Sequence, residues 1–136
     1  MGELETRIPK VIHYCWFGGN PLPELVRNCI KSWKKYCPDY EIVEWNESNF
    51  DIHSNLFVEQ AYQAKKWAFV ADYVRLYALY HCGGVYMDSD VEILQPIDRF
   101  LTDSAFNGFE TKDSPVTAVM GCVKGHKLFG ELLDYY

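Results

Sequence analysis

The stretch that decides the fold of this chain is Gly83-Gly84-Val85-Tyr86-Met87-Asp88-Ser89-Asp90-Val91. A short apolar run ends there in two carboxylates one residue apart. In an extended strand, alternate side chains share a face, so Asp88 and Asp90 would point the same way, whereas a bend would aim both at one ion. Carboxylate pairs at a strand exit attract hard cations such as Mg²⁺ or Mn²⁺, which bridge to phosphate oxygens. The stretch therefore predicts a cation site suited to phosphate-ester chemistry.

Strands and helices are expected on both sides of this stretch. Upstream, the sequence predicts strands over residues 10–17 and Glu41–Trp45. It also predicts a helix from Pro23 to before Pro38 and helices over residues 56–64 and 66–81. The downstream segments are strands over residues 85–87, 91–94, 106–110 and 117–123 and a helix over residues 126–136. This pattern indicates an α/β sandwich with a largely parallel sheet, in which ligands collect beyond the carboxyl ends of the strands.

Length, composition and charge limit the class of protein. With 136 residues, 49% of them apolar, the chain is expected to form one domain over residues 1–136. Its net charge is −6, from 13 basic and 19 acidic residues, which disfavours a nucleic-acid groove. No apolar stretch reaches the roughly 18 residues that span a bilayer, and no signal peptide is expected. Five cysteines without a C-x-x-C pair argue against a disulfide framework or zinc site and favour a cytoplasmic setting.

Two charged residues of the helix before Gly83 have two possible roles. Asp72 and Arg75 are three residues apart and are therefore neighbours on one stripe of that helix. They could form a surface ion pair that contributes at most about 0.5 kcal/mol. Alternatively, they face the same cleft as the carboxylate pair, where Arg75 would donate to hydroxyl or phosphate oxygens and Asp72 would accept from sugar hydroxyls.

Trp16 also has two possible roles, because it ends the first strand directly before Gly18-Gly19. It could be a core aromatic residue, as is expected of Trp33, Trp45 and Trp67. Alternatively, its indole stacks on a nucleobase, since the glycines let the backbone approach a ligand closely. His13 lies among apolar neighbours and is expected to be a hydrogen-bonded strand residue rather than a catalytic base.

Three segments together resemble a known family, glycosyltransferase family 32, the group with a DXD sugar-binding motif. They are the opening strand and loop Ile8-Pro9-Lys10-Val11-Ile12-His13-Tyr14-Cys15-Trp16-Phe17-Gly18-Gly19, the helix over residues 68–80, and residues 83–90. The family includes capsular-polysaccharide transferases and yeast-type mannosyltransferases, and the large glucosylating toxins share a similar core. The resemblance implies a GT-A fold and transfer of a sugar from a nucleotide-sugar donor, UDP-sugar before GDP-sugar, to a saccharide acceptor with retention of configuration.

The resemblance also implies roles for single residues. Trp16 would stack on the base, and Asp72 and Arg75 would contact the donor sugar. Asp88 would meet the ribose and the metal, and Asp90 would ligate Mn²⁺ or Mg²⁺. Gly84 is expected at the donor site as well, and Arg75 and Asp90 are the expected catalytic residues. The implied setting is bacterial surface-polysaccharide synthesis, with peripheral membrane association allowed and the oligomeric state left open.

The sequence leaves two alternative functions open. Family members usually continue for roughly a hundred residues more, so the chain is expected to be C-terminally truncated. It would then be a non-catalytic module that binds a nucleotide sugar. The other alternative is a phosphohydrolase with Asp88 as nucleophile and Asp90 as acid/base. That motif usually opens its domain, whereas 87 residues precede Asp88 here.

Overall fold

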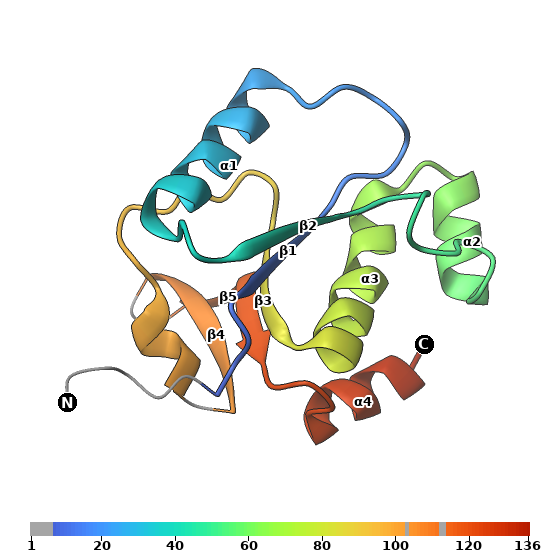
Figure 1. Cartoon of the computed structure of the whole chain (residues 1–136). Helices are drawn as coiled ribbons and strands as arrows, with labels where there is room; N and C mark the ends of the chain where they lie inside the picture. Colours follow the sequence, from blue (N-terminus) through green and yellow to red (C-terminus); the bar gives the residue numbers. More distant parts are fainter. Residues whose placement is uncertain (1–6, 103, 112–113) are drawn as a thin grey trace.

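A five-stranded mixed sheet with the strand order β2-β1-β3-β5-β4 forms the centre of the computed structural model, which describes residues 7–102, 104–111 and 114–136. The strands are β1 (Val11–Cys15), β2 (Glu41–Trp45), β3 (Gly84–Met87), β4 (Ala105–Thr111) and β5 (Ser114–Cys122). The helices are α1 (Glu24–Tyr36), α2 (Leu56–Gln63), α3 (Trp67–Cys82) and α4 (Lys127–Asp134), with a 3₁₀ turn η1 (Asp98–Thr102). Figure 1 shows their arrangement.

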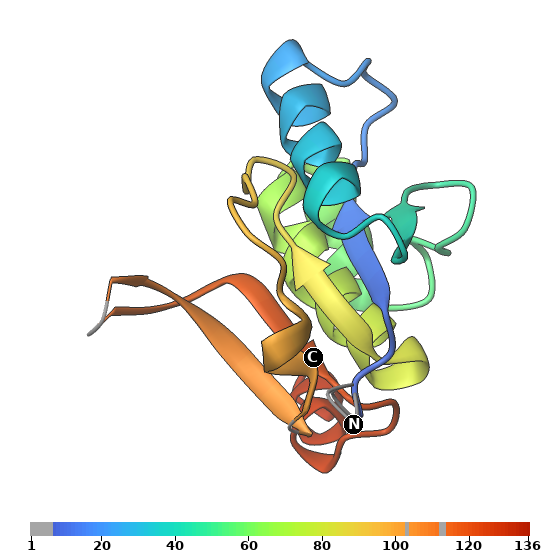
Figure 2. The ribbon, with the colours of Figure 1, turned by 60° about the vertical axis from the view of Figure 1, so that its left-hand side comes forward.

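The sheet is parallel only in the half that carries the site. Strands β2, β1 and β3 run parallel, whereas β3 with β5 and β5 with β4 are antiparallel. The largely parallel sheet expected from the sequence is therefore wrong for the second half. Parallel neighbours need a long crossover connection such as a helix, whereas β4 ends at Thr111 and β5 already begins at Ser114. This β4–β5 hairpin extends away from the helical layers (Figure 2).

Helices cover both faces of the parallel half. Helix α1 packs on one face, where Trp33 is fully buried against Ile12 and Val85 of the central strands. Helices α2 and α3 pack on the opposite face around Val58, Val70 and Val74. Helix α4 closes the end of the sheet beside α3 through the buried ring of Phe129. Helices therefore cover both faces of β1 and β3. Because these two strands are parallel neighbours, their carboxyl ends lie side by side at one edge of the sheet.

One predicted strand is absent. Residues 91–94 form no strand in the structure; instead they run along helix α1 as an irregular segment. Trp33 donates its indole N–H to the carbonyl of Val91 (2.8 Å), and the amide of Ile93 donates to Ser32 Oγ (2.9 Å). The alternation of apolar residues was a correct signal of burial, because Val91 and Ile93 pack on the α1 side of the core. The carbonyl of Val91 and the amide of Ile93, however, bond to side chains of helix α1 and not to a neighbouring strand.

The other predicted elements are confirmed, with ends that shift by at most three residues. The first strand ends at Cys15 rather than residue 17, and α4 begins at Lys127 after His126, whose Nδ1 accepts from the amide of Leu128. Gly83 follows α3 with φ of +71°, the positive value expected of a glycine that ends a helix. Among the described residues, none of the helices is long and apolar enough to cross a membrane.

Candidate active site

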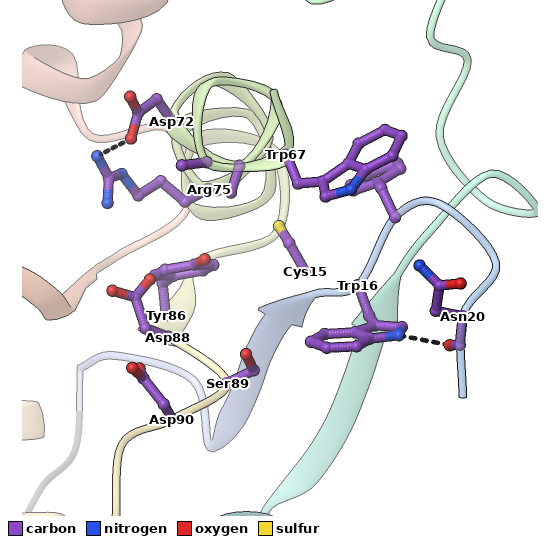
Figure 3. Close-up of a pocket in the computed structure, with 13 residues that line it drawn as sticks. Cys15, Trp16, Asn20, Trp67, Asp72, Arg75, Tyr86, Asp88, Ser89 and Asp90 are labelled. Atoms are coloured by element: carbon purple, nitrogen blue, oxygen red, sulfur yellow. Dashed lines mark hydrogen bonds and ion pairs between the residues drawn. The ribbon is translucent and has the colours of Figure 1, made fainter. Parts of the chain in front are cut away.

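A cavity of about 500 Å³ opens at the carboxyl ends of β1 and β3, beside the first half of helix α3. Three segments supply its lining: the end of β1 with the following loop, one stripe of α3, and β3 with the turn after it. The lining residues are Cys15, Trp16, Phe17, Asn20, Trp67, Ala68, Ala71, Asp72, Arg75, Tyr86, Asp88, Ser89 and Asp90. Figure 3 shows them around the cavity. Five of the six site residues predicted from the sequence are in this set.

The carboxylate pair lies in a tight turn rather than in an extended strand. The amide of Val91 donates to the carbonyl of Asp88 (3.0 Å), which closes the turn Asp88–Val91 directly after β3. Of the two arrangements considered from the sequence, the structure has the bend. Asp88 is half-buried and Asp90 is exposed, and both line the cavity. Their carboxylates lie on the same side of the turn (Figure 3), so one cation could contact both.

Burial raises the pKa of Asp88 above its ordinary value of 3.8. The neighbouring Tyr86 hydroxyl and the positive charge of Arg75 oppose that rise, while the negative charges of Asp90 and Asp72 add to it. Desolvation of the charged carboxylate is the largest cause. A cation bound beside Asp88 would relieve this cost, and this carboxylate is therefore suited to act as a metal ligand.

Asp72 and Arg75 form an ion pair inside the cavity. Arg75 Nη2 lies 2.6 Å from Asp72 Oδ1, and the side chains are 15% and 34% exposed. The guanidinium carbon of Arg75 also lies 5.9 Å from the centre of the Tyr86 ring, within cation–π range. A simple surface pair would point away from the sheet, whereas this pair lines the same cavity as Asp88 and Asp90. The pair can therefore reach a ligand that the turn binds.

Trp16 lies at the opposite end of the cavity from the carboxylates (Figure 3). Its indole N–H donates to the carbonyl of Asn20 (2.7 Å), so the loop after β1 folds back on the indole. Gly18 and Gly19 make that loop possible, with φ of +99° and +74°. Trp16 is only half-buried, which leaves part of its ring for the cavity. Trp16 also packs against the core on the α1 side, so it has features of both roles considered from the sequence.

Comparison with known proteins agrees with this geometry. Residues 23–107 match the family described as "Glycosyltransferase sugar-binding region containing DXD motif". The chain belongs to this family. It is 32% identical over 116 residues to inositol phosphoceramide mannosyltransferase 1 of Schizosaccharomyces pombe, a match that covers 77% of this chain and 34% of that protein. It is 29% identical over 133 residues to mannosyl phosphorylinositol ceramide synthase SUR1 of Saccharomyces cerevisiae, covering 90% of this chain and 33% of that protein.

The fold is the GT-A glycosyltransferase fold that the resemblance implied. The structure of the PaToxG glycosyltransferase superposes with a TM-score of 0.71 at 18% identity, over 93% of this chain and 59% of that chain. The chain spans about a third of the length of the curated relatives that it matches. The DXD motif of the family corresponds to Asp88-Ser89-Asp90 in this sequence.

The carboxylate oxygens of this DXD-family site fit a hard divalent cation as its ligands. Carboxylate oxygens are the ligands that Mg²⁺ and Mn²⁺ prefer, and the turn supplies two of them. In the described part of the chain, no group of three or more His, Cys, Asp or Glu side chains is arranged to hold a metal. A cation at this turn would therefore complete its coordination shell with ligand phosphate oxygens and water, as Mg²⁺ does at other phosphate sites.

Sequence reasoning missed several residues of the cavity, of which Trp67 is the largest. Trp67 was expected to be a core aromatic residue, yet it is half-buried and lines the cavity. A signal was available, because Trp67, Ala71 and Arg75 recur at intervals of four residues and therefore share one face of α3. Tyr86 and Cys15 were also missed. Burial raises the pKa of the Cys15 thiol to about 12, so this cysteine is not a nucleophile at neutral pH.

Gly84 lies outside the cavity lining, unlike the other site residues predicted from the sequence. It is buried at the start of β3 with φ of +116°, and a Cβ there would lie 2.7 Å from the carbonyl oxygen of Val11. The structure thus gives Gly84 a packing role between β3 and β1. The prediction for His13 is confirmed: its ring is buried and bonded to Gly83 O (2.9 Å) and Trp45 Nε1 (3.0 Å).

Proposed function

We propose that this chain carries the donor site of a metal-dependent glycosyltransferase. The observation that supports this most is that the Trp16 indole, an Asp–Arg pair and a DXD turn line one cavity. The proposed donor is a nucleotide sugar, with the base at the Trp16 end and the diphosphate at the turn of Asp88 and Asp90.

The side chains have distinct proposed tasks. Asp88 and Asp90 hold the cation, and Asp88 also accepts from the ribose. Asp72 accepts hydrogen bonds from donor-sugar hydroxyls, and Arg75 donates to the sugar or to the diphosphate. When bound, Mn²⁺ or Mg²⁺ neutralises the negative charge that develops on the diphosphate leaving group.

The proposed reaction exchanges one bond at the anomeric carbon of the sugar. The bond from that carbon to the diphosphate oxygen breaks, and its electron pair leaves with the nucleoside diphosphate. A hydroxyl oxygen of the acceptor bonds to the same carbon, and the hydroxyl proton passes to the departing diphosphate. As in the family resemblance, we propose retention of anomeric configuration. Arg75 stabilises the leaving group because its charge lies close to Asp88 and the turn.

The acceptor and the donor sugar are proposed from the names of the relatives. These names describe mannosyl transfer to inositol phosphoceramide in two yeasts, which makes a mannosyl donor and a glycolipid-type acceptor the first pair to test. UDP-sugars remain in the test because the sequence favoured them. The bacterial surface-polysaccharide role, the cytoplasmic setting and the peripheral membrane association stay predictions that no comparison supports.

The test is donor binding by the purified chain. We expect GDP-mannose or a UDP-hexose with Mn²⁺ to raise the melting temperature, because a ligand that binds only the folded state stabilises it. Asp90→Ala should abolish the shift. Glu92→Gln is the matched control, since Glu92 is exposed, lies two residues beyond Asp90 and does not line the cavity. If no nucleotide sugar shifts the melting temperature with Mn²⁺ present, the donor-site proposal is wrong.

A second candidate function is binding without turnover. It is an alternative that the sequence left open, and turnover is a proposal because the chain spans about a third of the length of its curated relatives. Release of nucleoside diphosphate, measured beside donor binding with and without a glycan or glycolipid acceptor, separates the two candidates. The phosphohydrolase alternative explains neither Trp16 nor the Asp72–Arg75 pair in the cavity, and a trapped phospho-aspartate at Asp88 would be needed to revive it.

A further inference from the structure

Trp67, the first residue of α3, has an unexpected position for a residue with a core pattern. Its ring packs edge to face on Tyr62, with ring centres 5.3 Å apart. It also lies directly against Gly18, where an added Cβ would come within 2.9 Å of Trp67 Cζ2. The indole is thus held between helix α2 and the loop that follows Trp16, and it lines the cavity from the α3 side.

A single carboxylate oxygen anchors this loop. The amide of Gly18 donates to Glu47 Oε2 (2.7 Å), and the hydroxyl of Tyr62 donates to the same oxygen (3.0 Å). Desolvation alone would raise the pKa of Glu47, but these two hydrogen bonds help to lower it overall, so the side chain stays an acceptor at neutral pH. Glu47 therefore connects the loop carrying Trp16 to the helix against which Trp67 packs.

The two indoles lie at the same end of the cavity. Figure 3 shows Trp16 and Trp67 toward one side with Asn20, and Asp72, Arg75, Asp88 and Asp90 toward the other. The polar atom of Trp16 is already bonded to the carbonyl of Asn20, so what its ring offers a ligand is an aromatic surface. An apolar, aromatic end opposite a charged end matches the two ends of a nucleoside diphosphate.

We propose that Trp67 is a second aromatic wall of the nucleobase site, across the cavity from Trp16, and that Glu47 is the positioning residue that fixes the loop between them. This proposal rests on the proposed function, because it takes the ligand to be a nucleotide. It extends that function, since the family resemblance gave the base contact to Trp16 alone. Stacking accepts any base. Polar groups at the edge of the space between the two indoles, such as the Asn20 amide, would then discriminate among bases.

The test measures binding of uridine monophosphate and UDP by calorimetry in the absence of metal. Trp67→Ala should weaken both by roughly five- to a hundredfold, the range for loss of one stacked aromatic side chain. Trp67→Phe should lose less affinity for these nucleotides than Trp67→Leu, because phenylalanine keeps an aromatic face. Phe69→Ala is the matched control: Phe69 is an exposed aromatic residue in the same first turn of α3, outside the cavity lining.

A second arm tests Glu47. We expect Glu47→Ala to raise the dissociation constant of uridine monophosphate while the melting temperature changes little, and Glu47→Gln to restore much of the affinity because its amide oxygen still accepts both hydrogen bonds. The conservative variant separates positioning of the loop from general loss of structure. Equal affinities of the Ala and Gln variants would contradict the positioning role.

The outcomes separate this proposal from the one on which it rests. If the wild-type chain binds uridine monophosphate or UDP and Trp67→Ala binds them equally well, only the second wall is wrong. Should Trp67→Ala fail to fold, equal affinities of the Phe and Leu variants would overturn the proposal instead. If the wild-type chain binds no nucleotide with or without Mn²⁺, the donor site itself is wrong, and the second wall with it.

Discussion

At the scale of single residues, the buried ring of His13 connects three parts of the structure that support the site. The indole nitrogen of Trp45 can only donate, so His13 Nδ1 accepts from it and Nε2 carries the proton that is donated to the carbonyl of Gly83. The ring is therefore neutral. Burial is the main reason that the pKa of His13 lies below its ordinary value of 6.5.

This tautomer predicts a loss of stability in acid. Because the unfolded chain binds the proton at higher pH than the folded chain, the contribution of His13 is fully present above pH 6.5 and is lost as the pH falls below it. The free energy of unfolding should fall by up to about 1.4 kcal/mol per pH unit from this residue. Urea unfolding at a series of pH values measures this slope, and His13→Gln should reduce it.

The control for this prediction is another histidine. His53 is exposed and pairs with Glu59 at 3.1 Å, and His53→Gln is the variant whose slope is compared with that of His13→Gln. If His13→Gln and the wild-type chain lose stability in parallel between pH 6.5 and the folded-state pKa of His13, the buried ring is not the group responsible.

At the scale of elements, strands β1 and β3 approach so closely that only glycine fits at position 84. An alanine Cβ would lie 2.7 Å from the carbonyl oxygen of Val11, and the backbone at φ of +116° is strained for any other residue. We expect Gly84→Ala to cost about 1–3 kcal/mol from the backbone and a comparable amount from the overlap. Chemical denaturation measures the sum.

A matched variant separates these two costs. Gly125 also has a positive φ, +74°, but an added Cβ there would meet nothing within 4 Å. Gly125→Ala should therefore show the backbone cost alone, about 1 kcal/mol. Equal losses for Gly84→Ala and Gly125→Ala would mean that the contact between β1 and β3 does not explain the need for glycine.

Helix α1 supports the carboxylate turn from the opposite face of the sheet. Ser32 Oγ accepts from the amide of Ile93 three residues after Asp90. Ser32→Ala removes that acceptor, which should cost about 1–3 kcal/mol and loosen the turn, so that UDP binding with Mn²⁺ weakens as well. Ser54→Ala is the comparison, because Ser54 Oγ also bonds to a backbone group, Asp51 O, but in an exposed loop far from the turn in sequence. A drop in stability without weaker binding would argue against support of the turn.

The sequence predicted best the elements in which the spacing of apolar residues indicates that one face is buried. Helix α1 was predicted from the helical spacing of Leu25, Val26, Cys29, Ile30 and Trp33, and it buries all of these residues except Leu25, which is exposed. The segment 91–94 shows the limit of the same signal, since alternation reveals which side chains are buried but not which backbone partner they meet. Strand direction was not readable either, because it depends on whether β3, β5 and β4 are joined by a crossover helix or by turns.

At the scale of the whole molecule, the sequence indicated which polar residues meet but not the second indole. One of the two roles considered for Asp72 and Arg75 placed them in the same cleft as Asp88 and Asp90, because they lie on one stripe of a helix that leads to the strand ending in this carboxylate pair. Trp67 was assigned to the core because a tryptophan in an apolar pattern is usually buried. Its exposure to the cavity depends on the Gly18 loop, which is 49 residues away in sequence.

The cavity lining has an excess of negative charge, as the whole chain does. The net charge of the chain is −6, and the cavity lining carries one guanidinium, Arg75, against three carboxylates, Asp72, Asp88 and Asp90. One positive and three negative groups leave a formal charge of −2 within the lining. A nucleoside diphosphate brings further negative charge to this end, and like charges at close range repel. A divalent cation is thus the natural partner of the diphosphate at this site.

This charge balance predicts that metal acts on the phosphates and not on the base. UDP should bind at least about tenfold more tightly with Mn²⁺ than with a chelator present, a difference of about 1.4 kcal/mol. Uridine, which lacks phosphate, should bind equally in both conditions because it contacts only the indole end. Calorimetry with the two ligands, each with Mn²⁺ and with EDTA, measures both effects on one protein preparation. A gain for uridine as large as that for UDP would mean that the cation organises the fold, and unchanged UDP binding in EDTA would mean that the turn of Asp88 and Asp90 does not hold the diphosphate through a metal.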